Sequence, residues 1–206
     1  MAKSKLIKDI ATNKITLEEG LQRLLIISYS LENEKLQYWI ESELNGYPNI
    51  SKLPVYRKRI GYEISYSGIN GGFQVKNVPL PLEYIPKEFK EVLKETCVLD
   101  GIKTLEETIR TDSKVGRNLT DMASAIYQKV GVQCINITQQ YSLSSLQMIV
   151  SNVKNKLILI LLDLEKDFGN LDNLDINVED VNEAEINEIN NNITKRIYFD
   201  GTSEEL

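Results

Sequence analysis

The sequence predicts an α+β fold that is predominantly helical, a single compact domain with a small β-hairpin or sheet. Three observations support this prediction. Apolar residues recur at helical spacing through most of the chain. One stretch near the middle instead alternates apolar and polar residues, which is typical of a strand. The length of 206 residues suits one domain, expected over residues 1–200.

The N-terminal region, residues 1–46, is predicted to be helical. Thr16 and Glu19 have the spacing of a capping box, in which the threonine hydroxyl and the glutamate satisfy free N–H groups at a helix start. Asn33 is an expected N-cap for the next helix, because its side chain can accept from a backbone N–H of the first turn. Gly46 is expected to end that helix.

The middle of the chain changes period, which predicts a β-hairpin over residues 58–78. Alternating apolar residues mark its first strand: Ile60, Tyr62, Ile64 and Tyr66. A turn follows at Gly68–Gly72, because glycine and asparagine tolerate positive φ. Residues 86–130 then return to helical spacing and begin with Pro86, a residue suited to the first turn of a helix. Residues 132–141 have the composition of a strand.

The C-terminal part is predicted to contain one long helix, residues 145–168, capped by Ser144 or Ser145. Its densest apolar run, Leu157–Leu162, is far shorter than the roughly 20 residues of a membrane span, so we expect a buried helix and no membrane span. Residues 170–200 form an acidic region with a helical repeat and then a short extended segment at 195–199. Residues 201–206 are expected to be a flexible tail.

Composition excludes several kinds of chemistry. The chain has no histidine, which removes a histidine general base, a histidine-dependent triad and a histidine metal ligand. Its two cysteines, Cys97 on a predicted helix and Cys134 on a predicted strand, are expected to be small buried hydrophobes. Because the N-terminus resembles no secretory signal, we expect a cytoplasmic protein.

The formal net charge of −6 is unevenly distributed. Residues 1–60 carry 10 basic and 7 acidic side chains, whereas residues 161–206 carry 3 basic and 13 acidic ones. Within that acidic end, Asp163, Glu165 and Asp167 have the spacing that begins a calcium loop. The glycine and the final glutamate of such a loop are missing, so we expect no metal site there. We expect no catalytic residues, no metal and no cofactor.

The strongest basic run, Arg57, Lys58 and Arg59, lies beside Tyr56. Cations next to an aromatic ring suit phosphate binding and base stacking, so these four residues are the candidate binding residues. A nucleic-acid-binding protein or metal-dependent nuclease that uses this run is one alternative function. Two other interpretations are a charged strand edge, which would discourage pairing with other chains, and a patch that pairs with the acidic C-terminal region.

One segment resembles the AbiTii-like domain family, which was defined on a bacterial abortive-infection component. Its members share a helix ending in W-x-x-x-E-L-x-G-Y, followed by L-P-x-Y-R. The matching residues here are Trp39, Glu43, Leu44, Gly46, Tyr47, Leu53, Pro54, Tyr56 and Arg57. The resemblance is specific over residues 21–57 and is similar in layout over most of the chain. It implies a role in anti-phage defence and brings no catalytic residue with it.

The signature is first of all a structural pattern. Gly46 is expected to take a left-handed conformation after the helix, and Tyr47 to pack back on its last turn. Glu43 and Arg57 have opposite charges and are expected to pair. From the resemblance we expect a non-enzymatic defence component that binds a phage or host protein. A second alternative is a self-associating structural or adaptor module, which would make the chain a homo-oligomer.

Overall fold

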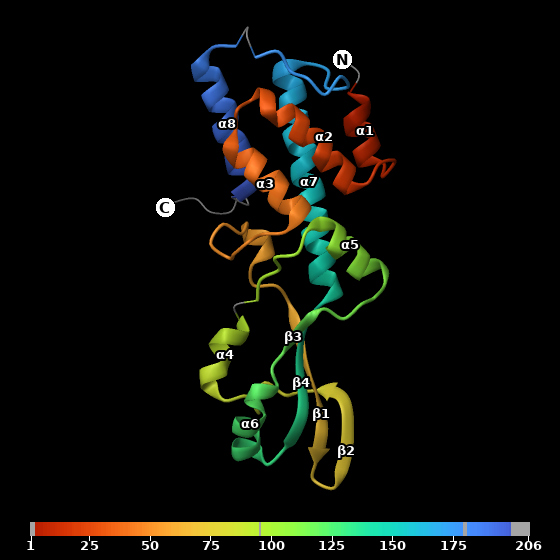
Figure 1. Ribbon diagram of the computed structural model, residues 1–206, viewed down its shortest axis with the longest axis vertical. Helices are drawn as coiled ribbons and strands as arrows, with labels where there is room; N and C mark the ends of the chain where they lie inside the picture. Colours follow the sequence, from red (N-terminus) through yellow and green to blue (C-terminus); the bar gives the residue numbers. More distant parts are fainter. Residues whose placement is uncertain (1–2, 95, 179–180, 199–206) are drawn as a thin grey trace. The chain divides into compact units, whose positions relative to one another are not determined.

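The computed structural model describes residues 3–94, 96–178 and 181–198 and confirms a predominantly helical α+β fold (Figure 1). The chain divides into two compact units, and the expectation of one domain over residues 1–200 stays a prediction. Unit 1 comprises Met1–Tyr56, Leu99–Glu106 and Met148–Leu206, and unit 2 comprises Arg57–Val98 and Glu107–Gln147. Unit 2 carries 11 basic and 8 acidic side chains, so the acidity of the chain belongs to unit 1.

Unit 1 is built from helices. It contains α1 (Lys5–Ala11), α2 (Leu17–Ser30), α3 (Glu34–Asn45), α8 (Glu183–Tyr198), the first half of α5 (Ile102–Arg110) and most of α7 (Leu143–Phe168). The N-cap roles of Thr16 and Asn33 are confirmed, whereas the Glu19 carboxylate, the second half of the predicted capping box, pairs with Arg23 instead. The Thr16 hydroxyl accepts from Glu19 N at 3.0 Å, and Asn33 Oδ1 accepts from Leu36 N at 3.0 Å. These bonds satisfy N–H groups that have no partner inside the helix.

Gly46 ends α3, as predicted, but its conformation differs from the expected left-handed one. Its φ of 93° and ψ of 159° lie outside the left-handed helical region and are accessible to glycine alone. A Cβ at this position would lie 2.9 Å from the Leu99 carbonyl oxygen. The next residue uses the same carbonyl, since Tyr47 N donates to Leu99 O at 2.7 Å. The backbone of residues 99–101 therefore lies too close to position 46 for any residue with a side chain, which explains why this position is glycine.

The long helix α7 begins at Leu143, two residues before the predicted start. Ser142 is its capping residue rather than Ser144 or Ser145, because the Ser142 hydroxyl accepts from Ser145 N at 3.3 Å. Among the described residues, α7 is the helix long and apolar enough to cross a membrane, and 44% of its most apolar window is buried. Core helices of soluble proteins meet the same criteria, so the finding does not assign α7 to a membrane.

The C-terminal helix α8 extends to Tyr198, so the prediction of an extended segment at 195–199 is wrong for its described residues, 195–198. The helical apolar repeat continues through that segment, and Ile193 and Ile197 are both buried on one face of α8. Residue 199 and the predicted flexible tail, residues 201–206, lie outside the described residues.

Unit 2 contains a four-stranded antiparallel sheet in the order β2-β1-β4-β3 (Figure 1). Its strands are β1 (Tyr62–Asn70), β2 (Phe73–Pro79), β3 (Gly116–Asn118) and β4 (Gln133–Tyr141). The predicted hairpin and the strand at 132–141 are confirmed. Strand β3 was not predicted, because Gly116, Arg117 and Asn118 carry no alternating apolar pattern.

Two helices, α4 (Lys87–Lys94) and α6 (Ala123–Val130), lie on one side of the sheet (Figure 1). Between the two layers lies the core of the unit, formed by Ile64, Tyr66, Leu80, Ile85, Leu93, Leu119, Met122, Ile126, Val132, Cys134 and Ile137. Cys97 lies beyond α4 in an extended segment that pairs with Lys58, so the prediction of a helical Cys97 is wrong.

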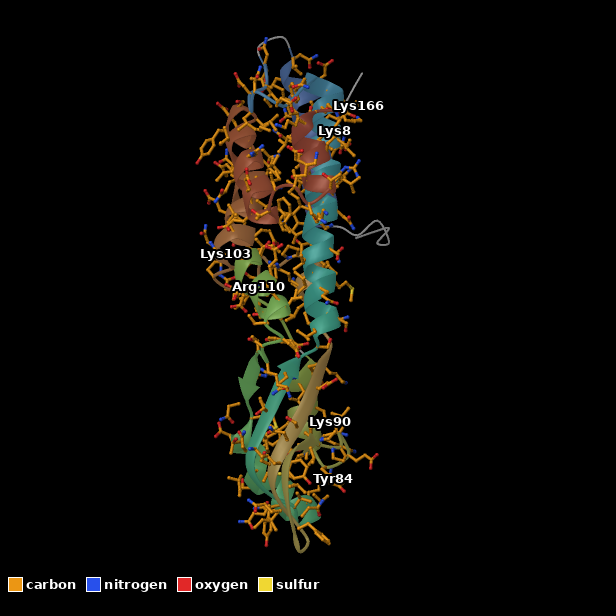
Figure 2. All side chains as sticks on the ribbon, turned by 90° about the vertical axis from the view of Figure 1, so that its right-hand side faces the viewer. Lys8, Tyr84, Lys90, Lys103, Arg110 and Lys166 are labelled. Carbon is orange, nitrogen blue, oxygen red and sulfur yellow. The ribbon has the colours of Figure 1, made fainter. Side chains whose placement is uncertain are left out.

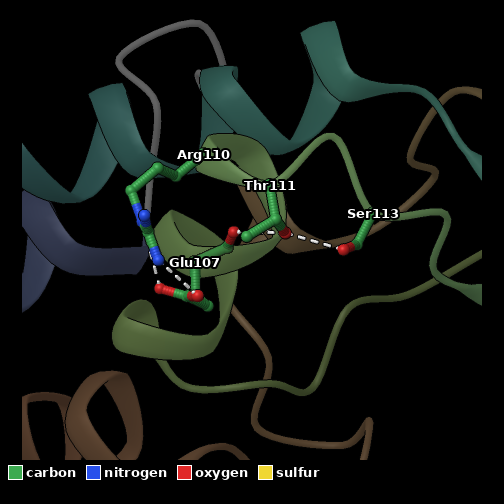
Figure 3. A network of polar contacts seen from close by, with 4 residues as sticks. All are labelled: Glu107, Arg110, Thr111 and Ser113. Atoms are coloured by element: carbon green, nitrogen blue, oxygen red, sulfur yellow. Dashed lines mark hydrogen bonds and ion pairs between the residues drawn. The ribbon is translucent and has the colours of Figure 1, made fainter.

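At the end of α5, Arg110 pairs with Glu107, and the Thr111 hydroxyl donates to Glu107 O at 2.8 Å (Figure 3).

Strand β1 pairs with β2 on one side and with β4 on the other, and the register of both pairings shifts near Ser67 and Gly68. Against β4, Ser67 pairs with Asn136 and Gly68 with Cys134, which leaves Ile135 as an extra residue. Against β2 the register also shifts between Tyr66 and Gly68. A Cβ on Gly68 would lie 2.0 Å from the Gln133 carbonyl oxygen, so the close approach of β4 requires glycine.

Candidate functional site

Four residues of the predicted signature form one hydrogen-bonded network in unit 1. Glu43 Oε1 accepts from the hydroxyls of Tyr47, at 2.7 Å, and Tyr56, at 2.8 Å. The Tyr56 hydroxyl in turn accepts from Trp39 Nε1 at 2.8 Å. Helix α3 supplies Trp39 and Glu43 one turn apart, and Gly46 directs the chain so that Tyr47 returns to the last turn. The expectation that Tyr47 packs back on α3 is therefore confirmed.

Glu43 and Trp39 are completely buried, and a buried carboxylate is costly unless polar partners compensate for lost water. The two tyrosine hydroxyls provide such partners. Lys156 of α7 adds a buried cation nearby. Its Nζ lies 5.3 Å from the centre of the Tyr56 ring and donates to the Arg196 carbonyl oxygen at 2.6 Å. This arrangement fixes α3, the Tyr56 segment and α7 in one geometry.

The network also affects α8. Burial raises the pKa of the Tyr198 hydroxyl, and electrostatic interactions with the side chains of Tyr38 and Glu43 raise it further. The sequence signature identified Trp39, Glu43, Tyr47 and Tyr56 but not Lys156 or Tyr198. Those two lie more than 90 residues away along the chain, and no local pattern marks them. Since the Glu43 carboxylate is fully buried, we interpret this network as one that stabilises the fold and not as a binding site.

The basic run does not stay together as one exposed group. Arg57 is completely buried and donates from its guanidinium to Val98 O at 3.2 Å, whereas Lys58 and Arg59 are exposed. Arg59 has a positive φ of 53°. Tyr56 is half-buried and belongs to the Glu43 network. Binding by these residues, and pairing of Glu43 with Arg57, stay predictions.

Leu44 and Pro54 complete the signature without polar chemistry. Leu44 is half-buried on α3, and Pro54 is buried just before the 3-10 turn Val55–Arg57. Both cysteines are free thiols. Cys134 is buried, and that burial raises its thiol pKa, while Cys97 is half-buried.

Two of the three carboxylates that resemble a calcium loop, Asp163 and Glu165, are bound to protein groups. Asp163 pairs with Arg196, and Glu165 accepts from Ser4 and pairs with Lys3 at 2.8 Å. Burial opposes the charge of Glu165, but its bonds with Lys3 and Ser4 prevail and lower its pKa to about 2. Within the described ranges, no three His, Cys, Asp or Glu side chains are grouped to hold a metal ion.

Three apolar side chains are exposed at the turn end of the sheet in unit 2. They are Ile69 (40% exposed), Phe73 (79%) and Ile135 (62%), which we call the hairpin patch. Ile69 pairs with Gln133, next to the bulge at Ile135. Phe73 pairs with Asn70, whose side chain donates to the Tyr66 hydroxyl at 3.2 Å, so Phe73 lies at the tip of the hairpin on the face that carries the core. Ile69 and Ile135 lie on the face opposite α4 and α6, which Figure 2 turns toward the viewer.

The hairpin patch is a better candidate for binding than the buried signature network. Scattered exposed apolar residues are common, but neighbouring ones often mark interaction sites. The adjoining residues Asn70, Gln74 and Gln133 are uncharged. The sequence alternation predicted the strand, but the bulge that brings Ile135 to this face could not be read from it.

Comparison with known proteins identifies the family. A family model described as AbiTii matches residues 4–190, which include the whole signature and parts of both units. The search of curated proteins gives no match, and neither does the search of solved structures. The match over nearly the whole chain confirms the resemblance seen in the W-x-x-x-E-L-x-G-Y segment. The chain belongs to the AbiTii family.

Proposed function

We propose that this protein acts in bacterial abortive phage infection by binding a phage or host protein through the hairpin patch. Membership of the AbiTii family, which was defined on an abortive-infection component, supports the defence role. The exposure of Ile69, Phe73 and Ile135 at one end of the sheet is the observation that carries the binding role.

The chemistry of the patch favours a protein surface as the partner. Protein interfaces are enriched in aromatic and apolar residues at their centre and poor in charges there. The patch has an aromatic ring, two isoleucines and uncharged neighbours, whereas a phosphate backbone requires cations. Phe73, the most exposed of the three, is the expected anchor of the interface.

A phage challenge of a sensitive host tests the proposal. The host expresses either the natural chain, the double variant Phe73→Ser/Ile135→Ser, or a control double variant, Ile50→Ser/Met148→Ser. The control residues are exposed apolar side chains of unit 1, at 59% each. We expect the natural chain and the control to reduce plaque counts and the patch variant to lose that protection. Circular dichroism of each purified chain verifies folding.

Three outcomes oppose the proposal. Unchanged plaque counts with the natural chain, despite confirmed expression, contradict the defence role. Equal protection by the patch variant and the natural chain contradicts the binding surface. Loss of protection by the control variant as well shows that the effect does not belong to the patch. A pull-down from infected cells then compares proteins captured by the natural chain and by the two variants.

Nucleic-acid binding is a second candidate, favoured by the positive balance of unit 2 and by the exposed Lys58 and Arg59. Salt-dependent retention of DNA or RNA, lost on Lys58→Ala/Arg59→Ala, supports it. Absence of retention at low salt removes it.

The proposal also assigns the chain to the cytoplasm, and cell fractionation tests this assignment. Self-association through the patch is distinguished by light scattering. A strictly monomeric chain over a broad concentration range excludes the adaptor alternative.

A further inference from the structure

Unit 1 contains a cavity of about 370 Å³ at the turn between α1 and α2. Its volume lies within the range of about 300–1,000 Å³ that is usual for small-molecule sites. The lining residues are Ile10, Asn13, Lys14, Ile15, Thr16, Leu17, Glu106, Val150 and Lys154. The hairpin patch and the Glu43 network contribute none of them, so the cavity is separate from the sites described above.

Glu106 is the acidic group of this cavity. Its side chain is half-buried, and among the residues that the structure describes none donates a hydrogen bond to it. Burial raises the pKa of this carboxyl, and the neighbouring charge of Glu18 raises it further. A half-buried carboxylate without a donor is unfavourable, and a ligand that brings an ammonium group would relieve that cost.

Lys154 is the positioned cation. Its Nζ donates to Asn13 Oδ1 at 2.6 Å and to the Ala11 carbonyl oxygen at 3.4 Å. An ammonium has three donors, so one remains for a ligand. Asn13 has a positive φ of 56°, a conformation that asparagine tolerates better than most residues. Lys14 adds a second, more exposed cation to the lining.

Apolar side chains complete the wall of the cavity: Ile10, Ile15, Leu17 and Val150. The cavity therefore offers an acceptor for a cation, donors for an anion and an aliphatic surface within the volume of a small molecule. We propose that this cavity binds a small zwitterion with an aliphatic body, of the class of aliphatic α-amino acids. The ammonium group pairs with Glu106, the carboxylate pairs with Lys154, and the side chain packs on the isoleucines and Val150.

Isothermal titration calorimetry on the full chain tests this assignment with three probes. L-leucine carries both charges, L-leucinamide lacks the carboxylate, and 4-methylpentanoate lacks the ammonium group. L-leucinamide also stands for the first residue of a peptide. A hydrogen bond to a charged group contributes enough to change affinity by about tenfold or more. We therefore expect saturable binding of L-leucine, and binding at least about tenfold weaker for each of the other two probes.

Two variants separate the charges. Glu106→Gln should lower the affinity for L-leucine by about tenfold and leave the affinity for 4-methylpentanoate unchanged, because only the contact with the ammonium group is lost. Lys154→Gln should lower the affinity for L-leucine and leave the affinity for L-leucinamide unchanged, because L-leucinamide has no carboxylate. Glu107→Gln is the matched control, since Glu107 is the next residue of α5, is exposed and pairs with Arg110.

The assignment is overturned if L-leucine gives no saturable binding to the natural chain. It is also overturned if L-leucinamide binds as tightly as L-leucine, which would indicate a peptide terminus, or if Glu106→Gln binds L-leucine unchanged. Circular dichroism verifies that each variant folds. Should Lys154→Gln not fold, Glu106→Gln with the three probes decides the question alone. None of these results depends on plaque counts, so the hairpin patch is tested independently.

Discussion

Removal of the Tyr56 hydroxyl is the sharpest test of the Glu43 network. Tyr56→Phe keeps the ring but deletes the donor to Glu43 Oε1 and the acceptor for Trp39 Nε1. A hydrogen bond to a charged group contributes about 1.5–3 kcal/mol, and a buried donor left without an acceptor costs about 1–3 kcal/mol. We expect the free energy of unfolding to fall by about 3 kcal/mol.

Two further variants calibrate this value. Tyr47→Phe deletes one donor to Glu43 and keeps the bond between Trp39 Nε1 and the Tyr56 hydroxyl, so we expect a loss of about 2 kcal/mol. Tyr29→Phe changes an exposed tyrosine on α2 and should stay within about 0.5 kcal/mol. The order of the three losses is therefore Tyr56, Tyr47, Tyr29.

Urea unfolding followed by tryptophan fluorescence measures these losses. Trp39 is the single tryptophan of the chain and lies inside the network, so its emission reports on unit 1 directly. The slope of the free energy against urea should be the same in all variants, which shows that the midpoint shift reflects stability. A Tyr56→Phe chain no less stable than Tyr29→Phe would refute the reasoning.

Three further predictions concern other parts of the chain. Gly68→Ala should destabilise unit 2 by about 3 kcal/mol in thermal unfolding, because the added methyl group meets the backbone of β4, while Gly72→Ala, whose Cβ meets open space, should not. Because the pKa of Glu165 falls from 4.5 to about 2 on folding, its stabilisation should be present above pH 4.5 and disappear toward pH 2. Urea unfolding at both pH values should show Glu165→Gln losing stability only at the higher one, and an equal loss at both is the contrary result. Alkylation followed by mass spectrometry should modify Cys97 before Cys134, since burial protects Cys134 and raises its pKa; the reverse order contradicts this.

Local features of the fold could be predicted because local chemistry determines them. The caps at Thr16 and Asn33 depend on a bond across three residues, and the hairpin depends on alternation along one strand. Strand β3 depends instead on pairing with β4, where the partner residues lie 20 to 24 positions further along the chain, and its own three residues carry no pattern. Helix α8 exceeds its predicted length because Ile193 and Ile197 keep the helical repeat past the charged residues.

The division into two units could not be predicted for a related reason. The chain passes between the units inside α5 and α7, so no glycine- or proline-rich linker marks those boundaries. Among the candidate sites, the signature was visible in the sequence, while its partner Lys156 was not. The hairpin patch was hidden because a bulge decides which face receives Ile135. The Glu106 cavity joins three distant segments, and only the folded chain brings them together.

The central claim is that this AbiTii protein limits phage infection by binding a protein partner through the hairpin patch. The most direct measurement is the plating efficiency of one phage on hosts that express equal amounts of three chains. These are the natural chain, Phe73→Ser/Ile135→Ser and Ile50→Ser/Met148→Ser. We predict that plaques are reduced by the natural and control chains and restored by the patch variant. Equal plaque reduction by all three chains would contradict the claim.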